Sequence, residues 1–167
     1  MLPYLLLLPA LVVQAPESAI PGAIEVSRGV FVLKGTPHEG LCTILKKEHV
    51  VRVIDLRRDD EPNLDCESEG SRLQELGIQY IRFTVGRVPS AADFDFLRTL
   101  LKDLPRGAHL LIHCSNGNRA AAAVCPWLVL DKGMKVEEAI ALAREAGLKA
   151  QDTEAAVRKY IASQSRS

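Results

Sequence analysis

Apolar and polar positions along the chain alternate between two kinds of pattern. Short apolar runs at Val50–Leu56 and His109–Ile112 are typical of strands buried on both faces of a parallel sheet. Apolar residues spaced by three and four positions over Glu67–Leu76, and again after Ser90, are typical of amphipathic helices. Because strands and helices alternate, we predict an α/β three-layer sandwich with a mainly parallel central sheet flanked by helices.

Further elements complete this pattern. Two short strands are expected at Ala23–Val26 and Val30–Leu33, and an alternating strand at Gln79–Val85. Helical spacing predicts two C-terminal helices, Val136–Ala146 and Asp152–Ser163. No internal repeat is evident, and a chain of 167 residues suits one domain with one core.

Capping signals predict where one early helix begins. Thr36, Pro37 and Glu39 resemble an N-cap, a first-turn proline and a capping-box acid. The helix that they introduce is expected to end near Glu48.

The same signals mark a later helix. Ser90 and Asp93 are expected to cap a helix that ends before Pro105. Pro126 lies well inside the next helix and is expected to kink it, because proline donates no backbone hydrogen bond.

The sequence AHLLIHCSNGNRAAAA, residues 108–123, places a cysteine between an apolar strand and an alanine-rich helix. Gly117 permits a tight turn, so Cys114 is expected at the end of a strand, facing a helix N-terminus whose N–H groups and dipole favour a thiolate and a bound oxyanion. Arg119 adds a planar charged fork that suits two oxygens of a phosphate group. The loop is therefore a candidate nucleophile and anion site. The alternative is a buried structural cysteine beside an unrelated arginine.

A second polar cluster follows the other core strand. Asp55 and Arg57 stand where that strand ends. Since ligands bind at the carboxyl ends of parallel strands, these residues are expected at the same edge of the sheet as Cys114.

Charge and composition exclude some classes of partner. The formal net charge is zero and no long run of Lys or Arg occurs, which gives no footprint for nucleic acid. A small anionic ligand fits this balance better.

The N-terminus carries an apolar segment that predicts export. Leu2–Val13 is short for a membrane span and ends in small residues that resemble a signal-peptidase site. We expect a signal peptide at residues 1–15, a linker at residues 16–22 and one domain at residues 23–167, in a periplasmic or secreted protein without stable membrane association after cleavage. No Lys or Arg precedes the apolar run, so an uncleaved anchor, or a misread start of a cytoplasmic protein, are alternatives.

The four cysteines do not form a dense disulfide framework. They are Cys42, Cys66, Cys114 and Cys125. Only a Cys42–Cys66 disulfide is considered, because Cys114 must stay reduced to act as a nucleophile.

Three segments, VIDLRRDDE, YIRFTV and IHCSNGNRAA, resemble in this order the cysteine-dependent phosphatase superfamily of tyrosine and dual-specificity phosphatases. More narrowly, they resemble the bacterial phosphatase-like domain found beside β-lactamase-like hydrolases and as exported single domains. The resemblance covers roughly Val30–Tyr160 and implies a dual-specificity-phosphatase-like fold. It also implies a phosphorylated small molecule or phosphoprotein, including phosphotyrosine-like substrates, as the partner, and no cofactor.

The resemblance assigns a role to each loop residue. Cys114 would attack phosphorus and form a phosphocysteine that water hydrolyses, Arg119 would hold phosphoryl oxygens, and His113 would orient the loop by hydrogen bonding. Asp55 either supports the loop from the neighbouring strand or only ends that strand. The backbone groups implied in phosphate binding belong to Ser115, Asn116, Gly117 and Asn118.

Three features depart from the superfamily pattern. Four residues rather than five separate Cys114 from Arg119, a shorter form that the narrower bacterial family shares. Ala120 stands where a Ser or Thr usually helps the thiolate to leave. Gly86 and Arg87 occupy the segment in which the general acid is expected.

Two nearby acids are the nearest replacements. Asp93 is the candidate general acid, with helix capping as its alternative role, and Asp95 is expected on a solvated face. Because general acid catalysis contributes about 10²- to 10⁴-fold, turnover of unactivated esters is expected to be weak.

Two other functions compete with phosphatase activity. One is a rhodanese-like sulfurtransferase that carries sulfur as a Cys114 persulfide, which the short loop favours and the rest of the chain does not. The other is a non-catalytic phosphate or phosphoprotein binder that uses Arg119. No metal site is expected, because His109 and His113 share a strand face without a third ligand at suitable spacing.

Overall fold

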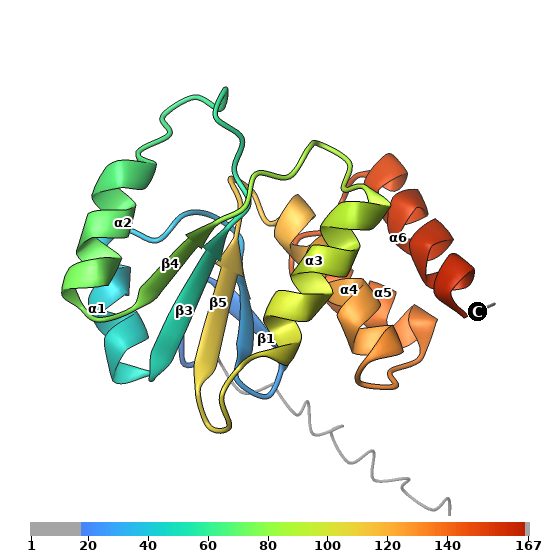
Figure 1. Cartoon of the computed structure of the whole chain (residues 1–167), viewed down its shortest axis with the longest axis horizontal. Helices are drawn as coiled ribbons and strands as arrows, with labels where there is room; N and C mark the ends of the chain where they lie inside the picture. Colours follow the sequence, from blue (N-terminus) through green and yellow to red (C-terminus); the bar gives the residue numbers. More distant parts are fainter. Residues whose placement is uncertain (1–17, 166–167) are drawn as a thin grey trace, which may run out of the picture.

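A five-stranded sheet lies between two layers of helices in the computed structural model, which describes residues 18–165 (Figure 1). The strands are β1 (Ala23–Ser27), β2 (Val30–Leu33), β3 (Val50–Asp55), β4 (Gln79–Arg82) and β5 (His109–His113). Their order is β1-β2-β5-β3-β4, with β1 antiparallel to β2 and the other neighbours parallel. The predicted three-layer α/β sandwich with a mainly parallel sheet is confirmed.

Six helices of the described chain cover the two faces of this sheet. They are α1 (Glu39–Lys47), α2 (Cys66–Glu75), α3 (Ala91–Lys102), α4 (Asn118–Leu130), α5 (Val136–Glu145) and α6 (Gln151–Gln164). Helices α1 and α2 lie on one face and the remaining four on the other (Figure 1). Because side chains of a strand alternate between faces, Leu111 of β5 packs into the α1–α2 core while Ile112 packs into the larger core.

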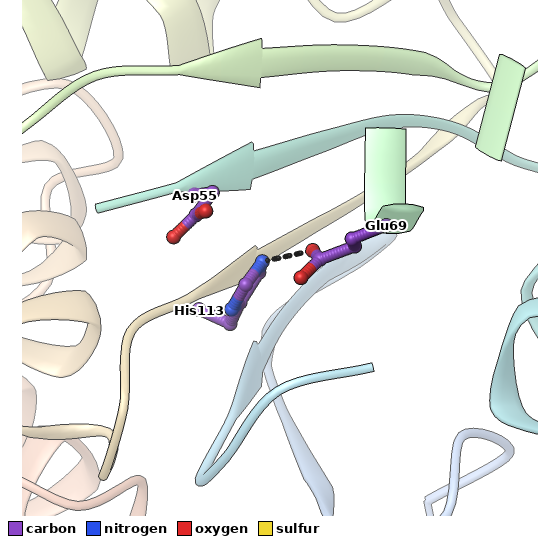
Figure 2. Close-up of side chains that lie close together, drawn as sticks. All are labelled: Asp55, Glu69 and His113. Carbon is purple, nitrogen blue, oxygen red and sulfur yellow. Dashed lines mark ion pairs between the residues drawn. The ribbon is translucent and has the colours of Figure 1, made fainter. Parts of the chain in front are cut away.

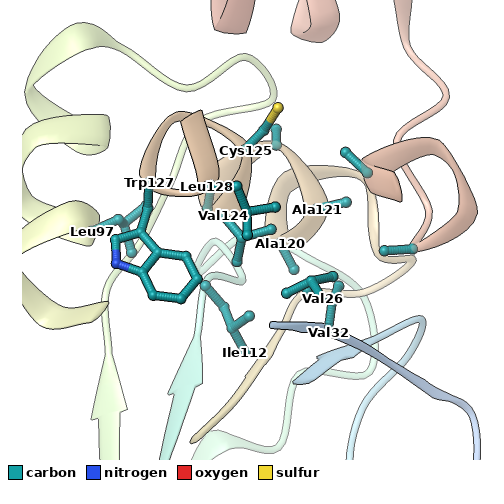
Figure 3. Close-up of a cluster of buried hydrophobic side chains, with 14 of the residues drawn as sticks. Val26, Val32, Leu97, Ile112, Ala120, Ala121, Val124, Cys125, Trp127 and Leu128 are labelled. Carbon is teal, nitrogen blue, oxygen red and sulfur yellow. The ribbon is translucent and has the colours of Figure 1, made fainter. Parts of the chain in front are cut away.

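Helix α4 is the centre of the larger core. It is buried from Arg119 to Leu128, and it contacts α3, α5 and α6. The small side chains of residues 120–123 let it lie close to the sheet, and Figure 3 shows Ala120 and Val124 next to Ile112 of β5. The helix continues through Pro126 to Leu130.

Two predicted boundaries need correction. Helix α1 begins at Glu39 and not after Thr36, because the Nδ1 atom of His38 accepts the Leu41 N–H (3.3 Å) and makes His38 the N-cap. Strand β4 ends at Arg82 and not at Val85. The segment after Arg82 is irregular, although the Val85 N–H still donates a hydrogen bond to the Leu56 carbonyl (3.4 Å).

The N-terminal predictions fall partly outside the described residues. The signal peptide predicted for residues 1–15 lies there entirely. Ile20, expected in the linker, is fully buried against the α1–α2 core, so the packed domain begins before Ala23. Between residues 18 and 165, no helix combines the length and apolar character needed to cross a membrane.

The cysteines are unpaired. Cys42, Cys114 and Cys125 are buried and Cys66 is half-buried, all as free thiols. The Cys42–Cys66 disulfide considered from the sequence is not formed.

The turn between α5 and α6 approaches α4 so closely that its glycine is required. Gly147 has a φ of +123°, and a Cβ there would lie 3.1 Å from the Cα of Gly117. Gly133 has a φ of +75° but no atom within 4 Å of the corresponding position, so it is a matched control.

We expect Gly133→Ala to lower the free energy of unfolding by about 1–2 kcal/mol through its left-handed backbone alone. Gly147→Ala should lower it by roughly 1–3 kcal/mol more, because the new methyl group overpacks the contact with Gly117. Urea unfolding of both variants measures this difference. Equal losses would show that the close contact between the two turns relaxes freely.

Candidate active site

The cysteine loop joins the end of β5 to the start of α4, as predicted. Gly117 is the N-cap of α4 and has a φ of +88°. Its N–H donates a hydrogen bond to the Sγ atom of Cys114 (3.2 Å), and Asn116 lies 3.8 Å from the same sulfur through its Oδ1 atom. An N–H group of a helix terminus therefore points at the buried sulfur and stabilises negative charge on it.

Asn118 fixes this loop to the α5–α6 turn. Its Oδ1 atom accepts the N–H groups of Lys149 (2.8 Å) and Ala150 (3.0 Å), and its amide nitrogen donates to the hydroxyl of Thr153 (3.1 Å). Its backbone N–H, predicted to bind phosphate, donates to the side chain of Asn116 (3.1 Å). The side chain of Asn118 thus acts as a structural anchor that the sequence did not reveal.

Arg119 is held in place by one half of its guanidinium group. Nη1 donates to the carbonyls of Leu56 (2.9 Å) and Val85 (3.2 Å), which follow β3 and β4. Nη2 donates to the hydroxyl of Ser115 (3.1 Å) and contacts Glu61. The side chain is buried, so Nη1 positions the guanidinium group while Nη2 faces Ser115 and Glu61.

Glu61 is a site residue that the sequence analysis missed. It lies in the loop between β3 and α2, and its Oε1 atom is 2.6 Å from Nη2 of Arg119 and accepts the Arg58 N–H (2.7 Å). Although burial alone raises the pKa of a carboxyl group, hydrogen bonds from the Arg58 backbone, Ser115 and Arg119 hold the pKa of Glu61 below its ordinary value. The sequence did hold one sign of Glu61: it belongs to the charged run Arg57–Glu61 directly after β3, at the edge of the sheet that was predicted to carry the site.

These segments enclose a cavity of about 400 Å³. It is polar, and no described residue that lines it is aromatic. The lining residues are Arg58, Glu61, Pro62, Arg87, Ser115, Asn116, Asn118, Arg119, Ala150, Asp152 and Thr153.

Asp55 and His113 lie beneath the loop in a buried ionic network. Asp55 accepts hydrogen bonds from Nε (2.9 Å) and Nη2 (2.8 Å) of Arg57 and from the hydroxyl of Tyr80 (2.6 Å). Against the effect of burial, Arg57, the charge of His113 and Tyr80 hold the pKa of Asp55 well below its ordinary value. Asp55 therefore supports the end of β3 through Arg57. None of these hydrogen bonds reaches a side chain of the cysteine loop.

The His113 imidazole faces Glu69 of α2 and not the cysteine loop (Figure 2). Its Nε2 atom is 2.8 Å from Oε1 of Glu69, and neither ring nitrogen makes a hydrogen bond of good geometry to a described residue. Successive strand residues point to opposite faces, so His113 turns away from the side of Cys114. The expected hydrogen bond from His113 to the loop is not present.

Asp55, Glu69 and His113 also have the atoms of a metal site, all within 4.8 Å of one another. No local sequence pattern links Glu69 with His113, because Glu69 comes from α2 and His113 from β5. However, Nη2 of Arg57 lies 2.8 Å from Asp55 and 2.5 Å from Glu69. The guanidinium group of Arg57 thus pairs with both carboxylates and offsets one of their two negative charges.

The predicted general acid is engaged elsewhere. Asp93 forms a capping box with Ser90, accepting its backbone N–H (2.7 Å) and hydroxyl (2.8 Å), and it is not a lining residue of the cavity. Asp95 is exposed, as expected, and accepts a hydrogen bond from Tyr160. The geometry thus favours the capping role of Asp93 over proton transfer.

The model of one protein family, described as DSP-PTPase phosphatase fused to NAD+ Kinase, matches residues 13–163. No curated protein matches the chain.

Several solved structures share the fold at low identity. A DUF442 protein from Shewanella putrefaciens CN-32, described as a phosphatase, is 18% identical, with 86% of this chain and 93% of that chain covered and a TM-score of 0.70. PTPMT1 in complex with PI(5)P is 18% identical, with 87% and 97% covered and a TM-score of 0.72. TpbA of P. aeruginosa in complex with pTyr is 18% identical, with 89% and 86% covered and a TM-score of 0.63.

The ionic network predicts a pH-dependent contribution to stability. Removing one partner of a buried ion pair costs about 3–5 kcal/mol, so Asp55→Asn should lower the free energy of unfolding by this amount at neutral pH. Because the pKa of Asp55 is lowered on folding from 3.8, the contribution is complete above that value and is lost as the pH falls below it. Urea titrations of both proteins from neutral to acidic pH measure the difference.

Asp60→Asn is the control for this experiment, since Asp60 is an exposed partner of Arg58. It should leave the stability almost unchanged. A difference between wild type and Asp55→Asn that stays constant down to strongly acidic pH would contradict the assignment.

Proposed function

The chain belongs to the DSP-PTPase phosphatase family, whose model spans most of it, and we propose that it hydrolyses phosphate monoesters by covalent catalysis at Cys114. One observation carries the proposal: Cys114 and Arg119 share a loop at the N-terminus of α4, and Arg119 borders a polar cavity. A thiolate supplies the nucleophile, while the guanidinium and loop amides supply an oxyanion site.

The proposed reaction has two steps. The Cys114 thiolate attacks phosphorus, the bond to the leaving oxygen breaks, and a phosphocysteine forms. Water then attacks phosphorus and returns the electron pair of the S–P bond to sulfur. Arg119 keeps Nη1 on the carbonyls of Leu56 and Val85, so that Nη2 binds a phosphoryl oxygen without further rearrangement of the guanidinium.

Ala120 affects the second step. It is fully buried and carries no hydroxyl that could assist the departing thiolate. We therefore expect hydrolysis of the phosphocysteine to be the slower step.

The rim of the cavity favours a small polar substrate. Arg58 and Arg87 add two cationic groups beside Arg119, and the described lining has no aromatic side chain to stack on a phenyl ring. The related structures of PTPMT1 and TpbA are complexes with PI(5)P and with pTyr, respectively. We favour small phosphate monoesters with a further anionic group over phosphotyrosine peptides.

Cysteine-dependent hydrolysis of p-nitrophenyl phosphate tests this function. Under reducing conditions the wild type should release p-nitrophenol slowly, and Cys114→Ser should lose this activity because a hydroxyl is a far weaker nucleophile than a thiolate. Cys42→Ala, on α1 in the opposite core, is the matched control and should retain it. Activity that survives Cys114→Ser would overturn covalent catalysis by this residue.

Two further assays separate the competing functions. Formation of thiocyanate from thiosulfate and cyanide would indicate sulfur transfer. Phosphate binding that depends on Arg119, without turnover in either assay, would indicate a binding module. Inhibition constants of small anionic monoesters and of a phosphotyrosine peptide, measured in the p-nitrophenyl phosphate assay, rank the two substrate classes.

We also propose that the protein is exported to the periplasm or secreted. The support is the apolar segment Leu2–Val13 and the small residues that end it at Ala15.

Expression of the full chain with a C-terminal tag in a bacterium tests export. We expect the tagged protein in the periplasm or medium with an N-terminus at Pro16, and a chain lacking residues 1–15 should stay in the cytoplasm. Full-length protein found in the cytoplasm would contradict this proposal.

A further inference from the structure

The proposed reaction lacks a proton donor at the expected place. Gly86 and Arg87 follow β4, and Asp93 is held in its capping box. A leaving alkoxide or phenoxide without a donor is costly, so an acid on another element would have to supply the proton. Only Glu61 and Asp152 are acidic among the described residues that line the cavity.

We propose that Glu61 is the general acid of this phosphatase, and that the phosphoryl group of the substrate itself releases its carboxyl group from Arg119. This inference rests on the proposed function.

Substrate and Glu61 would compete for the same nitrogen of Arg119. The Glu61 carboxylate lies 2.6 Å from Nη2 of Arg119, which is the nitrogen left free by the two carbonyl bonds of Nη1. A phosphoryl oxygen needs the same nitrogen. Binding of a phosphate monoester therefore displaces the carboxyl group by a short distance, and leaves it beside the phosphoryl group at the cavity wall.

The displacement also changes the proton affinity of Glu61. Arg119 now helps to keep the pKa of Glu61 low. Once Arg119 binds the substrate, Glu61 loses that cation and faces a dianion, and both changes raise its pKa. Glu61 then takes up a proton from solvent as the substrate binds.

Other charged side chains line the same cavity as Glu61, and Asp60 pairs with one of them, Arg58. Together these residues are Arg58 and Asp60 of its own loop, Arg119 of α4, Arg87 of the segment after β4 and Asp152 of α6. Three of them are cations, which the substrate dianion offsets when it occupies the cavity.

The proton and charge balance closes over one cycle. In the first step the thiolate forms the S–P bond, and the leaving oxygen takes its proton from the Glu61 carboxyl group. In the second step Glu61, now a carboxylate, accepts a proton from the attacking water while the S–P bond breaks. Phosphate then leaves and the thiolate is restored, and Glu61 returns its proton to solvent when it pairs with Arg119 again.

Asp152 is the weaker candidate. Its Oδ1 atom accepts the N–H (2.7 Å) and the hydroxyl (3.3 Å) of Thr153 in the first turn of α6. Its side chain is exposed and makes no ion pair with Arg119.

Leaving groups of different basicity test the role of Glu61. In Glu61→Gln, kcat for phenyl phosphate should fall by about 10²- to 10⁴-fold, because phenoxide needs a proton. The kcat for 2,4-dinitrophenyl phosphate should change only a few-fold, since its leaving group departs as an anion. The matched controls are Asp60→Asn, which removes the same charge from the same loop, and Asp152→Asn, which removes it from the cavity wall.

The pH dependence gives a second readout. The kcat of the wild type for phenyl phosphate should fall as the pH rises through the pKa of Glu61 in the complex, and Glu61→Gln should lack this limb. Equal losses for both substrates, or a rise in KM alone, would reduce Glu61 to a positioning partner of Arg119. Higher activity on both substrates would make it an inhibitory contact. Selective loss of phenyl phosphate turnover in Asp152→Asn would transfer the role to Asp152. Each of these results overturns the proposal.

Calorimetry of tungstate binding keeps the test independent of turnover. In two buffers of different ionisation enthalpy at mildly acidic pH, the wild type should take up protons on binding and Glu61→Gln should not. Equal proton uptake by both proteins would overturn the inference. Failure of the proposed function has a different signature: 2,4-dinitrophenyl phosphate would then be hydrolysed by neither protein, or equally by Cys114→Ser.

Discussion

The guanidinium group of Arg119 joins the three segments on which the site depends. Nη1 binds carbonyls that follow β3 and β4, so the carboxyl ends of two parallel strands are tied to the first turn of α4. A buried arginine without such partners would cost several kcal/mol, whereas five donors in a rigid fork can meet two carbonyls and still leave a nitrogen for a ligand. A lysine has no second nitrogen to divide between these tasks. Hydrogen bonds of the Arg119 guanidinium group thus hold the cysteine loop and the two strand ends together.

The α5–α6 turn is a second support of the cysteine loop. Gly117 and Gly147 bring the cysteine loop and the α5–α6 turn into backbone contact, and Asn118 closes the joint with hydrogen bonds to Lys149 and Ala150. Beneath the loop, hydrogen bonds between Asp55 and Arg57 fix the end of β3. A loop that must present a thiolate and several N–H groups in one orientation needs such supports, since misplacement by about 1 Å costs about 10²-fold in rate.

Much of this arrangement could be predicted from the sequence, because it depends on local patterns. Apolar runs predicted the core strands, Ser90 and Asp93 predicted a capping box, and the pattern around Cys114 predicted a turn from strand to helix. The family match agrees with the segments that resembled a cysteine-dependent phosphatase. Local patterns failed where a nearer residue competed: His38 caps α1 in place of Thr36, because its imidazole reaches the Leu41 N–H.

Side-chain partners far apart in the sequence could not be predicted in this way. Glu61 lies 58 positions before Arg119, and Glu69 reaches His113 from a helix whose buried face has no distinct signal for a carboxylate. Both pairs join polar side chains that neighbouring strands bring to one edge of the sheet, and only the strand order β4-β3-β5 sets which loops meet there. The consequence for function is specific. The superfamily pattern places its acid after the strand that corresponds to β4, but here the acid in contact with Arg119 follows β3. Under the proposed mechanism the proton would come from the loop after β3, because the carboxyl group of Glu61 and the phosphoryl group would compete for Nη2 of Arg119.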